Sequence, residues 1–299
     1  MKKTVIIILA FCVTHIFPQS SDNSGFAILK FGNSARDMAM SDFGAVGNVD
    51  LANVYYNPAQ LSSLKTPQLF FSHNSWIQDV SSQNIAGSSS LYGIPFAVQV
   101  NNTMINDIEV RVKPGEVQSK FDARYFSASF STSARIYNNL FAGATFKYLY
   151  ENILSDESSG YALDFGFAYN EIVPNLNLGM SVRNIGSVTA LRTQSADLPT
   201  DFRVGASYNF YFEKISSSVN LISGIQKYLP ETDLHFHIAA EYSYDETVFL
   251  RFGYVTGFES RNISFGLGFS WIGARLDYAY IPFDFYLGNS NTISLLYNF

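Results

Sequence analysis

The sequence predicts an all-β protein: a transmembrane antiparallel β-barrel of about 14 strands, with an N-terminal segment containing short helices that plugs the lumen. Three observations lead to this fold class. Large apolar residues alternate with small or polar residues from Pro67 onward. Aromatic residues make up 16% of the chain and charged residues only 15%, which is far from ordinary globular usage. The last apolar row, which ends at Phe299, continues the alternation to the final residue.

The alternation identifies the strands, because side chains of a β-strand point to opposite faces with a period of two. In residues 161–169 every odd position is large and apolar and every even position is small or charged, and residues 202–210, 248–254 and 263–271 repeat the pattern. An even strand number suits a bacterial barrel with antiparallel neighbours. We expect strands near 67–76, 82–92, 94–104, 121–134, 139–151, 159–170, 175–184, 201–212, 215–227, 233–244, 247–257, 261–270, 273–280 and 291–299.

The N-terminus indicates export and divides the chain into three parts. Lys2 and Lys3 precede an apolar stretch at 5–13, which is typical of a signal peptide covering residues 1–20. Residues 21–66 then form the plug segment and residues 67–299 the barrel. Cys12, the only cysteine, lies in the signal; a lipid anchor there is the alternative, disfavoured by the bulky Phe11 beside it. Charged and polar residues interrupt every later window long enough for a transmembrane helix.

These features predict the outer membrane of a Gram-negative bacterium, with outer-membrane lipid and the barrel-assembly machinery as partners. The formal net charge of −6, which becomes −8 without Lys2 and Lys3, excludes nucleic acid as an expected partner. The final apolar row resembles the C-terminal assembly signal of outer-membrane barrels. Its members are Ile293, Leu295, Tyr297 and Phe299.

The free-energy cost of placing a charge in lipid indicates which face of the barrel wall lines the lumen and which meets lipid. A basic residue facing lipid near the bilayer midplane would cost about 2–4 kcal/mol. The charged face therefore lines the lumen, with Lys147, Asp164, Arg183, Arg203, Glu241, Arg251, Arg275 and Asp277. The opposite face meets lipid, with Phe146, Tyr148, Leu163, Phe165, Val204, Leu250, Phe252, Phe265, Leu267, Leu276 and Tyr278. The alternative is a soluble sandwich or lipocalin-like barrel whose large apolar side chains fill the inside.

The lumen face also carries many glycines, which leave space for an occupant, and the segment before the barrel can supply it. We expect short helices near 34–40 and 57–61. In the second, Asn57 suits the N-cap, Pro58 the first helical position and Gln60 the third position of a capping box. Capping explains this tripeptide, and direct ligand contact is the alternative. The lumen charges either pin the plug, through Arg36, Asp37 and Asp42, or form a selectivity filter.

Motifs at both ends resemble the PorV/PorQ-like family. The N-terminal ones are Gly25-Phe26-Ala27, Leu29-Lys30, Gly32, Ala35-Arg36, Ala39-Met40, Ala45-Val46, Asn57-Pro58-Ala59 and Leu61, and the C-terminal ones are Asp277-Tyr278-Ala279, Pro282, Leu287-Gly288-Asn289, Ile293-Ser294-Leu295 and Phe299. Ser41 stands where this family commonly has glycine. The resemblance implies a FadL-like barrel of 14 strands whose plug carries the family motif residues Gly32, Ala35, Arg36, Asn57, Pro58 and Ala59.

The resemblance also implies a non-enzymatic role in type IX secretion and surface attachment. Such a protein docks secreted cargo that carries a C-terminal signal domain and presents it to a surface sortase or similar protein. The alternative functions are a FadL-like transporter of hydrophobic small molecules and a general porin-like barrel.

Catalytic and cofactor chemistry have little support in the sequence, so we expect no enzyme activity, catalytic residue or cofactor. No nucleophile elbow or phosphate-binding glycine loop is present, and no cysteine lies beyond Cys12. His235 and His237 share one face of a strand with Glu241, which would allow a metal site only with a further close ligand. A polar lumen wall explains these imidazoles equally well, so we expect no metal.

Overall fold

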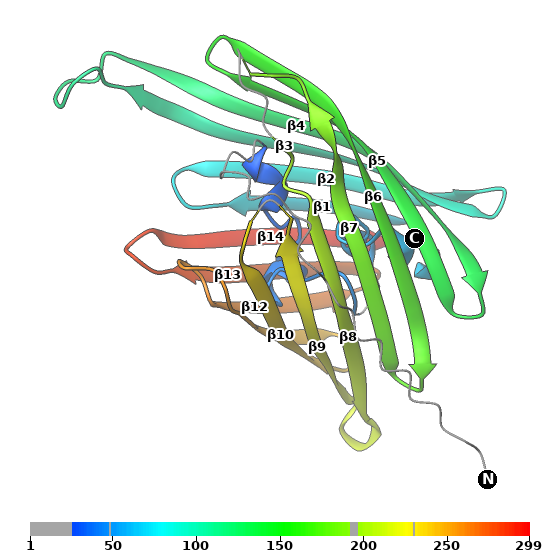
Figure 1. The fold of residues 1–299 in the computed structure, drawn as a ribbon. Helices are drawn as coiled ribbons and strands as arrows, with labels where there is room; N and C mark the ends of the chain where they lie inside the picture. Colours follow the sequence, from blue (N-terminus) through cyan, green and yellow to red (C-terminus); the bar gives the residue numbers. More distant parts are fainter. Residues whose placement is uncertain (1–25, 48, 192–196, 230) are drawn as a thin grey trace.

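A computed structural model describes residues 26–47, 49–191, 197–229 and 231–299, and the expected signal peptide lies outside them. Within these residues, 14 antiparallel strands form a closed barrel in which β14 pairs with β1 (Figure 1). The strands are β1 Gln68–Ser75, β2 Val80–Leu91, β3 Ile94–Val110, β4 Ser119–Tyr137, β5 Leu140–Ile153, β6 Asp156–Val173, β7 Leu176–Val188, β8 Asp201–Phe212, β9 Ser217–Tyr228, β10 Leu234–Tyr244, β11 Val248–Val255, β12 Ile263–Trp271, β13 Ala274–Phe283 and β14 Gly288–Asn298. The predicted fold class is confirmed.

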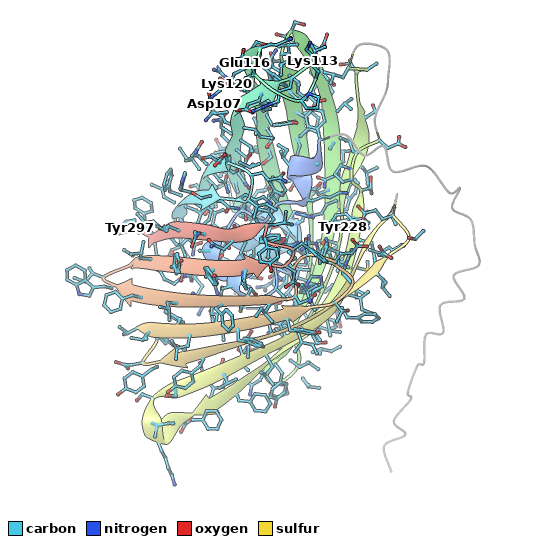
Figure 2. All side chains as sticks on the ribbon, turned by 90° about the vertical axis from the view of Figure 1, so that its left-hand side faces the viewer. Asp107, Lys113, Glu116, Lys120, Tyr228 and Tyr297 are labelled. Carbon is cyan, nitrogen blue, oxygen red and sulfur yellow. The ribbon has the colours of Figure 1, made fainter. Side chains whose placement is uncertain are left out.

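The strands β3 and β4 run further than the sequence pattern predicted. Their hairpin projects from one end of the barrel, and its far part carries the charged side chains Asp107, Lys113, Glu116 and Lys120 (Figure 2). Pairing continues there past an irregularity between Ile105 and Ile108. A strand that projects beyond the bilayer no longer needs an apolar face, so the alternation that identified the rest of the strand is lost.

The two ends of the barrel differ in their connections. At one end, which we call the short-turn end, tight turns such as residues 92–93, 138–139 and 272–273 join the strands, and β1 begins and β14 ends there. The opposite, long-loop end carries the longer connections, including residues 111–118 and 256–262. Because outer-membrane barrels place short turns in the periplasm and longer loops outside, the short-turn end faces the periplasm.

The outer wall is an apolar surface with aromatic side chains near both ends. All the side chains that we expected to meet lipid lie on the outer face, and Phe146, Leu250 and Leu267, for example, are exposed. Exposed aromatic residues mark the short-turn end at Tyr137, Tyr211, Tyr244 and Trp271 and the long-loop half at Tyr161, Tyr254 and Tyr280. This arrangement is that of a lipid-facing belt flanked by aromatic girdles.

The described N-terminal residues lie inside the barrel, and we call residues 26–47 and 49–66 the plug (Figure 1). It contains η1 Ala27–Lys30, α1 Ala35–Ala39, η2 Leu51–Tyr55 and η3 Pro58–Ser63, of which only α1 is an α-helix. Ser34 caps α1 by accepting from the Asp37 amide, as local sequence favours. No helix in the described ranges is long and apolar enough to cross a membrane.

The second helical element departs in part from its prediction. Asn57 does cap η3, by accepting from the Ala59 amide at 3.1 Å, and Pro58 opens it. Gln60 forms no capping box, because its amide nitrogen instead donates to the Ala45 carbonyl within the plug. The capping box lies on η2, where Asp50 and Asn53 bond reciprocally.

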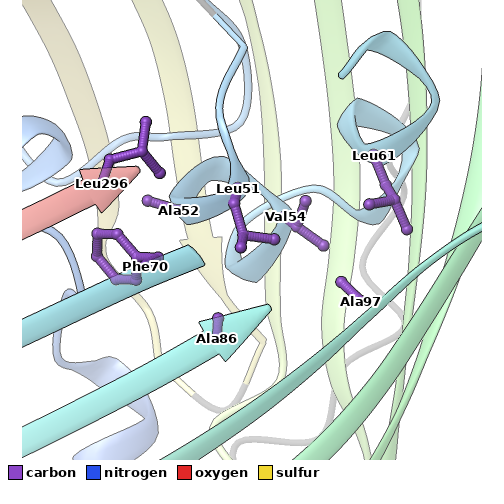
Figure 3. Packing of buried hydrophobic residues seen from close by; sticks show 8 residues of the cluster. All are labelled: Leu51, Ala52, Val54, Leu61, Phe70, Ala86, Ala97 and Leu296. Carbon is purple, nitrogen blue, oxygen red and sulfur yellow. The ribbon is translucent and has the colours of Figure 1, made fainter. Parts of the chain in front are cut away.

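An apolar cluster fixes the later half of the plug to the wall (Figure 3). Its plug members lie on η2 and η3 and its wall members on β1, β2, β3 and β14, so the cluster spans the seam where the barrel closes. The eight buried residues are Leu51, Ala52, Val54, Leu61, Phe70, Ala86, Ala97 and Leu296. Burial of these side chains stabilises the docked plug through the hydrophobic effect.

Candidate functional site

The candidate site is the interface between the plug and the lumen wall, where six charged side chains, five of them buried, form a closed ring of alternating sign. In order around this charge ring they are Arg36, Glu241, Arg251, Asp277, Arg275 and Asp50. Neighbouring nitrogen and oxygen atoms are 2.9, 2.5, 2.8, 2.7, 2.5 and 3.0 Å apart in that order, and the last contact returns to Arg36. Two members come from the plug and four from β10, β11 and β13.

The ring offsets the free-energy cost of burying charged side chains in the lumen. Three guanidinium groups face three carboxylates, so the ring carries no net charge, and the side chain of Glu241 is only 2% exposed. Burial alone would raise the pKa of Asp50, but the guanidinium groups of Arg275 and Arg36 hold it below its ordinary value. The ring favours the interpretation that lumen charges pin the plug, because Arg36 and Asp50 each contact the wall.

A second buried cluster, on β7 and β8, also holds the plug. Asp201 pairs with both Arg183 and Arg203, at 2.7 and 3.0 Å. Arg203 also donates to the backbone carbonyls of Asp42 and Phe43, and Arg183 donates to a plug carbonyl. Asp201 was not among the predicted lumen charges, although it lies two residues before Arg203 and therefore on the same face of β8.

The remaining expected lumen charges also find partners. Lys147 pairs with Asp164 at 2.6 Å, and Lys147 further donates to Asn184. All eight charges that we placed in the lumen are therefore oriented inward and paired in the described structure, two of them in this pair, two in the second cluster and four in the charge ring.

Only part of the expected plug pairing occurs. Arg36 reaches the wall as predicted, and Asp42 lies 3.6 Å from Arg261. The prediction that Asp37 pairs with a lumen charge is wrong, because its carboxylate accepts hydrogen bonds from Ser34 and Asn53 within the plug. Burial, together with the nearby Asp50 charge, raises the pKa of Asp37 to about 7.

Glycines on the lumen face form seats for the plug. A side chain at Gly143 would meet the Pro58 backbone at 2.4 Å. One at Gly205 or Gly224 would meet the Phe43 ring, at 2.5 and 2.1 Å. A plug atom is a close neighbour of six lumen glycines: Gly143, Gly166, Gly179, Gly205, Gly253 and Gly266. Together with the helices, these contacts bring the plug against every strand of the barrel.

The family motif residues occupy structural positions in the plug. Gly32 lies where a Cβ would clash with Asp42, and Ala35 donates its amide to Ser294. Asn57 accepts from its helix and donates to the carbonyls of Ala45 and Phe167. Capping and plug docking thus account for the side-chain contacts of Asn57.

The two histidines on β10 make hydrogen bonds and a ring contact and are not arranged as metal ligands. His237 Nδ1 lies 2.8 Å from the Ser41 carbonyl and Nε2 lies 3.2 Å from Gln226. His235 stacks on Phe258, with ring centroids 3.8 Å apart, and Glu241 belongs to the charge ring. Across the described ranges, no three His, Cys, Asp or Glu residues are arranged to hold a metal ion.

Aromatic rings gather where the plug approaches the long-loop end. Trp76 stacks on Phe31 of the plug at 5.0 Å and meets Phe283 edge to face. Arg261 lies over the rings of Trp76 and Phe258. These contacts pack the start of the plug against the β1–β2 loop, the β11–β12 loop and the end of β13, which adds cation–π and stacking energy to the docked state.

The residues of the expected assembly signal lie on the closing strand. Ile293, Leu295 and Tyr297 on β14 are exposed on the lipid side, and they pair with β1 residues from His73 to Leu69. The amide of Phe299 donates to the Pro67 carbonyl at the short-turn end. Their role in assembly stays a prediction.

Comparison with known proteins places the fold. The toluene transporter TodX of Pseudomonas putida superposes with a TM-score of 0.62 over 89% of this chain and 96% of TodX, at 12% identity. A FadL homologue of Pseudomonas aeruginosa gives a TM-score of 0.52 over 89% of this chain and 98% of its own, at 10% identity. The chain has the fold of these outer-membrane barrels. This fold, together with the apolar outer wall and its aromatic girdles, indicates the outer membrane of a Gram-negative bacterium.

Sequence comparison adds no family to this result. No family model matches the chain, and no curated protein matches it. The expected membership of the PorV/PorQ-like family is therefore not confirmed, whereas the FadL-like barrel that the resemblance implied is the fold observed.

Proposed function

We propose that the chain is a non-enzymatic transporter that admits hydrophobic small molecules across the outer membrane. The observation that carries this proposal is a barrel with the fold of TodX and the FadL homologue whose lumen holds a plug in contact with every strand. A freely conducting porin would leave the lumen charges in water, whereas here they are paired and buried. Entry of the small molecules then depends on movement of the plug or of the wall beside it.

Uptake measurements test the proposal. Cells that lack the gene should take up radiolabelled toluene and long-chain hydrocarbon more slowly than cells complemented with it. A water-soluble sugar serves as the control and should enter both strains equally. Equal uptake of the hydrophobic compounds in both strains would refute the proposal.

A second candidate, docking of secreted cargo in type IX secretion, draws support from the projecting β3–β4 hairpin. Its exposed, charged tip stands clear of the barrel and offers a partner an accessible edge (Figure 2). Under this candidate, deletion of residues 108–117 would leave the barrel folded. Proteins with a C-terminal signal domain would then accumulate in the periplasm. Normal surface display of such cargo in the deletion strain would exclude it.

A further inference from the structure

The inner face of β3 and β4 differs from the rest of the lumen wall. On most strands the inward side chains in the middle of the barrel are buried. Those of β3 and β4 are partly exposed, although their chain neighbours Val100 and Phe130 point to lipid. Solvent therefore reaches a space between these two strands and the plug. We call it the polar gap, and it is lined by Gln99, Asn101, Ser127 and Ser129.

The polar gap is closed toward the short-turn end by the last helix of the plug. Ala97, the next inward residue of β3, is buried in the apolar cluster that contains Leu61 of η3. Ser62 of η3 is hydrogen-bonded to Ser133 of β4 at 2.6 Å. Toward the long-loop end, Tyr125 of β4 is again partly exposed. The gap is therefore reached from the long-loop end, which faces the outside of the cell.

The lining of the gap carries amides and hydroxyls in place of the charges found elsewhere in the lumen. None of the inward residues at positions 97–103 of β3 and 125–131 of β4 is charged. At the side of the gap, Asn101 donates to Ser82 and accepts from Thr103. Such a wall offers both donors and acceptors, so it suits a neutral molecule that has both as well.

Asn84 of β2 adjoins this lining and lacks hydrogen-bond partners. It lies opposite Asn101 in the β2–β3 pair, and it is 1% exposed. Within the described ranges, neither atom of its side-chain amide is hydrogen-bonded. A buried amide without partners costs free energy, and folded proteins satisfy nearly all such groups. A molecule in the polar gap with one donor and one acceptor near Asn101 would satisfy Asn84.

A carboxylate and an aromatic ring lie where the gap meets the long-loop end. Glu151 of β5 lies opposite Tyr125 of β4 and is 6% exposed. In the part of the chain that the structure describes, Glu151 forms no ion pair or hydrogen bond. An ionised carboxylate only accepts, so Glu151 can bind two neighbouring hydroxyls of a ligand. The ring of Tyr125 offers an apolar face beside it.

We propose that the polar gap is a binding site for a neutral, hydroxyl-rich molecule, a mono- or disaccharide that enters from outside. Its hydroxyls donate to Glu151 and exchange hydrogen bonds with Asn84 and Gln99, and its ring lies against Tyr125. The lined part of β4, from Tyr125 to Ser129, is about 14 Å long at about 3.4 Å per residue, which accommodates a disaccharide. A hydrocarbon would leave the polar groups unpaired, so this site is distinct from the proposed transport function.

Saturation-transfer NMR on the full-length protein in amphipol tests the site. The probes are glucose, N-acetylglucosamine and maltose, with choline and glucose 6-phosphate as cationic and anionic comparators. We expect transfer to the neutral sugars and little to either ion, because the lining holds one carboxylate and no basic residue. If only water occupies the gap, none of the sugars will receive saturation, and the proposal is then wrong. Transfer to choline that equals transfer to the sugars would also overturn it.

Two variants and a matched control locate the binding. Asn84→Leu should weaken maltose about 5- to 10-fold, the effect of losing one or two hydrogen bonds, and it should raise the urea midpoint because an unpaired buried amide is removed. Ser127→Phe should abolish binding, since the new ring fills the gap. Asn102→Leu makes the same change beside Asn101 but on the outer face, and it should leave binding unchanged.

Equal maltose binding by Asn84→Leu and Asn102→Leu would refute the assignment, as would normal binding by Ser127→Phe. Heat-modifiable gel migration checks that each variant is folded. Sugar binding is measured on the purified protein, so its failure is separate from a failure of hydrocarbon uptake in cells, which tests the proposed function.

Discussion

Replacement of Glu241 by glutamine tests whether the charge ring holds the plug. Glu241 accepts from Arg36 Nε and Nη2, both at 2.9 Å, and from Arg251 Nε at 2.5 Å. Glutamine keeps the size of the side chain but removes the charge and replaces one acceptor by a donor. The ring then holds three guanidinium groups against two carboxylates, and the amide nitrogen faces a cation.

The expected loss is large because the site is buried. Removal of one partner from a buried ion pair costs about 3–5 kcal/mol, since the other charge remains buried without compensation. The matched control is Glu109→Gln on the projecting hairpin, where Glu109 pairs with Arg111 at 2.6 Å but is 44% exposed. An exposed pair of this kind contributes about 0–1 kcal/mol. The same chemical change should therefore give very different results at the two sites.

Urea unfolding of the detergent-solubilised protein, followed by tryptophan fluorescence and by heat-modifiable gel migration, measures the free energy of unfolding. Planar-bilayer recording of the same variants detects release of the plug: we expect Glu241→Gln to conduct in bursts and the unchanged protein and Glu109→Gln to stay closed. Equal unfolding free energies for the two variants, within about 1 kcal/mol, would show that the ring does not hold the plug.

The remaining predictions concern the plug itself. Gly224→Val places a side chain against Phe43 and should cost about 1–3 kcal/mol in urea unfolding, and adding Phe43→Ala should recover part of the loss if the glycine seat is the cause. Ser41 adopts a left-handed φ of 60°, so its replacement by glycine should raise the free energy of unfolding by about 0.5–1 kcal/mol and with it the urea midpoint. A lower midpoint would mean that the contact of Ser41 with His237 contributes more to stability than the backbone strain costs. Burial raises the pKa of Asp37 from its ordinary value of 3.8 to about 7 in the folded protein, so the folded state favours the protonated carboxyl. The free energy of unfolding should therefore fall as pH rises from about 5 to 7. Asp37→Asn should flatten this dependence, and an unchanged slope in urea midpoints across that range would contradict the assignment.

The barrel could be predicted because its determinants are local. In residues 161–169 the two faces of a strand are visible from alternation alone, and the cost of a basic residue in lipid decides which face turns inward. The lumen glycines likewise indicated an occupant before its contacts were known. The far part of the β3–β4 hairpin escaped prediction because water on both faces removes the constraint that creates the pattern.

Only the tertiary structure decided which charges meet. Arg36 and Glu241 are 205 positions apart, and their contact depends on strand register, the path of the barrel and the depth of the plug together. Asp50 lies in a segment without alternation, so no pattern marked it as the residue that closes the charge ring. Composition and periodicity thus determined a charged, glycine-lined barrel, whereas packing of the plug decided the pairing, because a buried charge takes whichever partner the fold brings within reach.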